Sequence, residues 1–71
     1  MNEELINKQA ILNSLLSTCE IISTGNHKRF TLAQMKIDMY RQRICEARCW
    51  NIDELAYEIM EWVNTFLENN I

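Results

Sequence analysis

The chain has 71 residues, a formal net charge of −3 and 48% hydrophobic residues, with one Gly and no Pro. This length suffices for one small domain with a marginal core, and the composition argues against a β-rich or disordered chain. No apolar run approaches the roughly 20 residues that a membrane-spanning helix needs, and the acidic start does not resemble a secretory signal. We therefore expect one helical domain over residues 1–71, cytoplasmic and without a membrane segment.

The first predicted helix spans residues 3–23. Glu3 and Glu4 suit the positive end of a helix dipole, and Gly25 and Asn26 form a helix stop, since both residues tolerate the left-handed conformation. The polar segment 24–29 is the predicted loop, and its short length favours an antiparallel pairing of the first two helices. The apolar residues expected on one face of the first helix are Leu5, Ile11, Leu12, Leu15, Leu16, Cys19 and Ile22.

The second and third helices are predicted from one capping signal that occurs twice. Thr31 is followed three positions later by Gln34, and Asn51 is followed by Glu54, which is the spacing of a capping box. An apolar residue precedes each cap and another follows it four positions later, as in a hydrophobic staple. The signals predict a second helix over residues 32–49, forming a hairpin with the first, and a third helix over residues 52–69.

The second helix carries two apolar stripes, which is more than one buried face requires. Its first stripe is predicted to be core and consists of Ala33, Ile37, Tyr40, Ile44 and Ala47. The second stripe consists of Leu32, Met35, Met39 and Trp50. Met and Trp are frequent at protein-binding surfaces. We expect the second stripe, with Trp62 of the third helix, to be a self-interface or a partner site; the alternative is that it packs against the third helix within one chain.

The charges divide the chain into acidic, basic and acidic thirds. Residues 28–48 hold six of the seven basic residues, and residues 49–71 hold five acidic residues and no basic one. Four of these carboxylates recur on the predicted solvent face of the third helix and form a candidate surface for a basic target: Glu54, Glu58, Glu61 and Glu68. Complementary charge between the second and third helices would guide pairing within or between chains.

The residues required for common catalytic sites are missing. One glycine cannot build a phosphate-cradling loop, and the only histidine, His27, lies in a polar loop beside two cations. The carboxylates of the third helix are expected to be solvated, and pKa tuning for acid–base catalysis requires burial. We therefore expect no enzyme activity and no cofactor.

The three cysteines have no recognisable metal or disulfide spacing. Cys45 and Cys49 are four residues apart on one side of the second helix, and only Cys19 and His27 would complete a set of four ligands. An odd number of cysteines indicates reduced thiols. Because cysteine is often buried, we expect packing roles and no metal, although a metal or regulatory role stays open.

The basic segment raises nucleic-acid binding as an alternative. Its candidate contacts are Lys28, Arg29, Arg41, Arg43 and Arg48. A pI of about 5.0 for the whole chain, however, differs from the basic pI of most nucleic-acid-binding domains. In a helix-turn-helix arrangement, moreover, the would-be recognition helix is the acidic one.

These observations together favour an all-α, three-helix protein that forms a homodimer. We expect a small non-catalytic regulator, inhibitor or adaptor that binds a larger protein through an apolar helix stripe or an acidic helix face. Small acidic helical proteins of this type are common among phage and mobile-element accessory proteins, an analogy of type and not of residues. The alternative is a regulator associated with nucleic acid.

Overall fold

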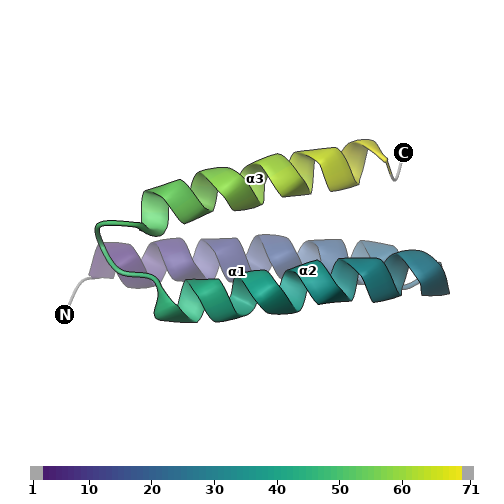
Figure 1. Cartoon of the computed structure of the whole chain (residues 1–71), viewed down its shortest axis with the longest axis horizontal. Coiled ribbons are helices and arrows are strands. Elements are labelled where there is room, and N and C mark those ends of the chain that lie inside the picture. The colour runs from purple at the N-terminus through teal and green to yellow at the C-terminus, as the bar shows by residue number, and fades with distance from the viewer. Residues whose placement is uncertain (1–2, 70–71) are drawn as a thin grey trace.

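The computed structural model describes residues 3–69, which form three helices: α1 (Glu3–Ser23), α2 (His27–Glu46) and α3 (Ile52–Glu68). The described residues contain no strand, which confirms the predicted all-α class. The helices lie along the longest dimension of an elongated bundle measuring 40 × 18 × 14 Å (Figure 1). Both α2 and α3 pack mainly against α1, so α1 is the central helix of the bundle.

One face of each helix forms the core. All five residues of the first stripe predicted for the second helix are buried, which confirms that prediction. The apolar face predicted for α1 includes two residues that are not buried, since Ile11 is 60% exposed and Ile22 is 43% exposed. The buried apolar side chains are Leu12, Leu16, Cys19, Ala33, Ile37, Tyr40, Ile44, Ala47, Ile52, Leu55, Ile59, Val63 and Phe66.

The start of α2 differs from the prediction, since the helix begins at His27 and not at Leu32. Asn26 is extended and caps the helix: its side-chain oxygen accepts a hydrogen bond of 3.0 Å from the backbone N–H of Arg29. Thr31, the predicted cap, lies inside the helix, and its hydroxyl donates to the carbonyl of His27. Asn26 is an equally good capping residue, and a threonine within a helix commonly bonds to the carbonyl four residues earlier. The predicted loop 24–29 is therefore shortened to residues 24–26.

The end of α2 also differs, because the helix stops at Glu46 and not at Cys49. Ala47 is extended, and the guanidinium of Arg48 donates hydrogen bonds of 3.0 Å to the carbonyls of Glu46 and Ala47. These bonds satisfy backbone oxygens that a helix end leaves unpaired. The link to α3 thus comprises residues 47–51.

The second capping signal places the start of α3 correctly but with different contacts. Asn51 is the N-cap residue, yet its side-chain oxygen accepts from the backbone N–H of Arg48 and makes no capping bond to α3. Trp50 is 84% exposed, so it does not form the expected staple over buried Leu55. At the other end, α3 stops at Glu68, with Asn69 as its C-cap.

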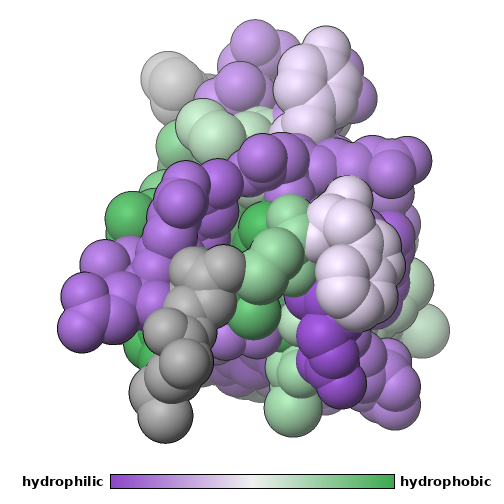
Figure 2. Space-filling view, turned by 90° about the vertical axis from the view of Figure 1, so that its left-hand side faces the viewer, coloured by the Kyte–Doolittle hydropathy of each residue, from purple (hydrophilic) through white to green (hydrophobic). Residues whose placement is uncertain are grey.

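An ion pair joins the start of α1 to the start of α3. The ammonium of Lys8 lies 2.7 Å from a carboxylate oxygen of Asp53 and 3.3 Å from one of Glu4. Figure 2 looks at the end of the bundle that carries the 47–51 link, where hydrophilic side chains predominate and apolar ones show between them. The Lys8–Asp53 ion pair thus links α3 to α1 outside the apolar core.

Candidate functional site

Three large apolar side chains form an exposed row on α2, which we call the α2 stripe: Leu32, Met35 and Met39. Their exposed fractions are 60%, 68% and 40%. Their spacing of three and four residues places them on one side of the helix, on the side away from the buried stripe. The alternative interpretation, in which this stripe packs against α3 within one chain, does not agree with these exposed fractions.

The two tryptophans do not belong to this row. Trp50 lies in the 47–51 link, beyond the end of α2, whereas Leu32 lies near the start of that helix. Trp62 is half-buried on α3, between the ring of Tyr40, at a centroid distance of 5.9 Å, and the ring of Phe66, at 5.4 Å. Of the five residues predicted as an interface, only the three of the α2 stripe lie in one exposed row.

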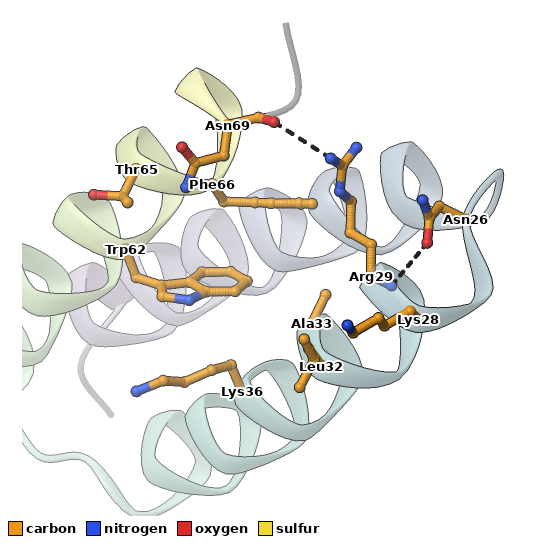
Figure 3. A pocket seen from close by; sticks show the side chains of 10 residues that line it. All are labelled: Asn26, Lys28, Arg29, Leu32, Ala33, Lys36, Trp62, Thr65, Phe66 and Asn69. Carbon is orange, nitrogen blue, oxygen red and sulfur yellow. Dashed lines mark hydrogen bonds between the residues drawn. The ribbon is translucent and has the colours of Figure 1, made fainter.

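A groove of about 530 Å³ lies beside the α2 stripe, between the start of α2 and the end of α3. Figure 3 shows Trp62 and Phe66 reaching from α3 toward Ala33 on α2. Arg29 spans one end, where its guanidinium donates to the carbonyl of Asn69 at 3.4 Å. The lining contains three basic side chains and no carboxylate: Asn26, Lys28, Arg29, Leu32, Ala33, Lys36, Trp62, Thr65, Phe66 and Asn69.

The four glutamates of α3 are exposed as predicted, but one of them has an internal role. Glu58 forms an ion pair with Arg43 of α2, and this hydrogen bond holds the pKa of the Glu58 carboxyl below its ordinary value. The same bond raises the pKa of Arg43. Burial, followed by the charge of Glu58, raises the pKa of the Tyr40 hydroxyl. Glu58 therefore joins α3 to α2.

The other three glutamates, Glu54, Glu61 and Glu68, form no ion pair with another residue in 3–69. They are exposed along the length of α3. Unlike Glu58, these three glutamates do not join α3 to another helix by an ion pair in the described residues.

The basic residues named for nucleic-acid binding do not gather into one patch. Arg41 faces α1, where it bonds to Ser17 at 3.0 Å and pairs with Glu20 at 3.5 Å. Arg43 faces α3, and Arg48 bonds to backbone carbonyls of the link. Lys28 and Arg29 lie at the opposite end of α2 from Arg48. Arg41, Arg43 and Arg48 thus make internal contacts in different parts of the bundle, away from Lys28 and Arg29.

The cysteines and the histidine are not brought together. Cys19 is buried in the core, and burial raises the pKa of its thiol. Cys45 and Cys49 are exposed, near the other end of the bundle from His27. Among residues 3–69, no group of three or more His, Cys, Asp or Glu side chains has the arrangement to hold a metal ion.

Sequence reasoning missed the groove and the Lys8–Asp53 pair, because both depend on how α3 packs against its neighbours.

Over the described part of the chain, no helix combines the length and the apolar character needed to cross a membrane. The chain matches no protein-family model, no curated protein and no solved structure in the comparisons made.

Proposed function

We propose that this protein is a small non-catalytic interaction module that binds another protein chain through the outer side of α2. It would act as a regulator, inhibitor or adaptor. The observation that carries the proposal is the α2 stripe, in which three large apolar side chains are exposed in one row. Single exposed apolar residues are ordinary, whereas a contiguous exposed row is typical of an interaction site.

Methionine also suits this role chemically. Met35 and Met39 have flexible, polarisable side chains that adapt to a partner surface, and methionine is frequent at such surfaces. The adjoining groove adds half-buried Trp62, a residue type that is common among the energetically dominant contacts of interfaces.

The acidic side of α3 is the second part of the proposal. Glu54, Glu61 and Glu68 would attract a basic surface of the target, mainly by raising the rate of association and by discriminating between partners. Such contacts lie at the rim of an interface and are screened by salt.

The proposal includes two features of assembly. The first is that α1 and α2 form an antiparallel hairpin, which is supported by a 2.8 Å hydrogen bond from the Gln9 amide, early in α1, to the carbonyl of Ile44, late in α2. The second is that the protein acts as a homodimer in the cytoplasm. The exposed thiols of Cys45 and Cys49 would persist in a reducing compartment.

Capture from an extract of the source cells tests the proposal. We expect immobilised wild-type protein to retain specific proteins, and Met35→Glu to lose them. Ile21→Glu is the matched control, because Ile21 is 70% exposed on α1, close to the 68% of Met35. Equal retention by all three proteins would refute a role for the α2 stripe.

The acidic side is tested separately by Glu54→Lys with Glu61→Lys, beside Glu3→Lys on α1 as the control. We expect the double variant alone to lose its target, with the loss greatest at low salt. Unchanged capture by the double variant would remove the acidic side from the proposal. The named basic residues face different sides and do not form one surface for nucleic acid.

A further inference from the structure

The α2 stripe lies in the middle of a longer exposed face that has opposite charges at its two ends. We call this the outer face of α2: Lys28, Leu32, Met35, Met39, Gln42 and Glu46. All six residues are exposed, and at 100° per residue they lie within an arc of about 80°. Neither Lys28 nor Glu46 forms an ion pair within residues 3–69.

This face is arranged almost symmetrically about the level of residue 37. Met35 and Met39 lie two residues to either side of that level, and Lys28 and Glu46 lie nine residues to either side. At 1.5 Å per residue, each charge is about 13 Å from the centre. A rotation by 180° about this level would exchange the two methionine positions and the two charged positions.

We propose that the outer face of α2 binds a second copy of this chain, with the two α2 helices antiparallel about a two-fold axis at the level of residue 37. Met35 then contacts Met39 of the second copy, and Lys28 pairs with Glu46 of the second copy. Each contact occurs twice, as in any isologous interface. This inference rests on the proposed function, in which the outer side of α2 is a protein-binding surface.

The charges select the second copy and its direction. An acidic ligand would be attracted at Lys28 and repelled at Glu46, and a basic ligand would meet the reverse. The face is matched by a helix with opposite charges at its two ends and apolar residues between them, which a second copy supplies at the same spacing. A parallel pairing would place Lys28 beside Lys28 and Glu46 beside Glu46, which is unfavourable.

Two further features agree with this arrangement. The three-and-four spacing of the α2 stripe is the spacing of a helix–helix seam. In addition, a cation in the first turn and an anion in the last turn both oppose the helix dipole, so Lys28 and Glu46 gain nothing from their own helix. A charge pair between copies gives both residues a favourable partner.

Light scattering across a concentration series tests the proposal, with reductant present so that Cys45 and Cys49 cannot cross-link. A contact between two single helices is small, so we expect dissociation at micromolar concentrations and a series from about 10 µM to about 1 mM. The wild-type mass should rise from 8.5 kDa toward twice that value. Met35→Glu should remain at 8.5 kDa, and Ile21→Glu should behave as wild type.

Charge exchange tests the antiparallel direction. Lys28→Glu and Glu46→Lys each place like charges together twice, so each should raise the dimer dissociation constant about three- to tenfold. The double variant carrying both substitutions should restore the wild-type constant. Because both substitutions favour the helix dipole, a weakened dimer cannot be attributed to a weakened helix. Helical circular dichroism of each variant verifies this.

Either of two results would overturn the inference. The first is a wild-type mass of 8.5 kDa throughout the series; if capture from extract then still depends on Met35, the proposed function survives with a different occupant. The second is a double variant that dimerises no better than the single variants, which would rule out this antiparallel pairing. A failure of the proposed function itself would give a different result, because capture from extract would then be the same for wild type and for Met35→Glu.

Discussion

The inner face of α2 consists of its four buried residues, Ala33, Ile37, Tyr40 and Ile44. Its apolar side chains have a helical spacing similar to that of the outer face, but the surroundings of the two faces differ. Ile37 on the inner face is fully buried, whereas Met35 on the outer face is 68% exposed. The inner face is covered because α1 and α3 converge on it, and no described element covers the outer face. Periodicity therefore identifies side chains that favour burial, but it does not identify what buries them.

Truncation of the inner face should have the largest effect on stability. We expect Ile37→Ala to lower the free energy of unfolding by about 2–5 kcal/mol, because it leaves a cavity where α2 contacts the rest of the core. Urea denaturation followed by circular dichroism measures this change. A loss below about 1 kcal/mol would contradict a central position for Ile37.

The N-terminal cap of α2 should have the next largest effect. Asn26→Ala removes the acceptor of the Arg29 backbone N–H, so we expect a loss of about 1 kcal/mol. Thr31→Ala is the control and should cost clearly less, because Thr31 is exposed within the helix. Equal losses, or a larger loss at Thr31, would indicate that the helix starts at the later capping signal.

The Arg43–Glu58 pair lies at the border between the two faces and should have a smaller, pH-dependent effect. Both side chains are nearly half exposed, so we expect Glu58→Gln to cost no more than about 1 kcal/mol at pH 7. The pKa of Glu58 is lowered in the folded state from 4.5. Its contribution is therefore present above pH 4.5 and is lost as the pH falls through the lowered pKa.

Denaturation of wild type and Glu58→Gln at pH 7 and at about pH 2.5 checks this sign. The difference in unfolding free energy between the two proteins should shrink at the acidic pH. A difference that grew on acidification would show that Glu58 is destabilised by its surroundings in the folded chain.

Truncation of the outer face should have the smallest effect on the stability of the dilute protein. At concentrations where the chain is monomeric, we expect Met35→Ala to change the free energy of unfolding by less than about 0.5 kcal/mol. Urea denaturation at low micromolar concentration measures it. A loss comparable to that of Ile37→Ala would mean that Met35 is buried within its own chain.

The sequence predicted the helices well where local chemistry alone determines them. The bounds of α1, the cap position of α3 and the four buried residues on the inner face of α2 follow from spacing and composition. The start of α2 was predicted wrongly because two capping residues, Asn26 and Thr31, compete within five positions, and the flanking residues permit a helix from either. Local sequence does not rank two such caps.

The candidate surface was predictable only in part, because it depends on packing between distant segments. The α2 stripe follows from periodicity, but its exposure depends on α1, and not α2, being the central helix. Glu58 is chemically like its neighbours on α3, and only its position opposite Arg43 gives it a structural role. The exclusion of Trp50 from the stripe follows from the early end of α2 at Glu46.

Methionine methyl NMR tests most directly whether the outer face of α2 binds a second copy of the chain. The probes Met35 and Met39 lie on that face, and Met60, 52% exposed on α3, is an internal control in the same sample. Across the concentration series, we predict that the Met35 and Met39 methyl signals shift together while the Met60 signal does not move. Signals that are all independent of concentration, or a shift confined to Met60, would contradict the pairing of two copies through this face.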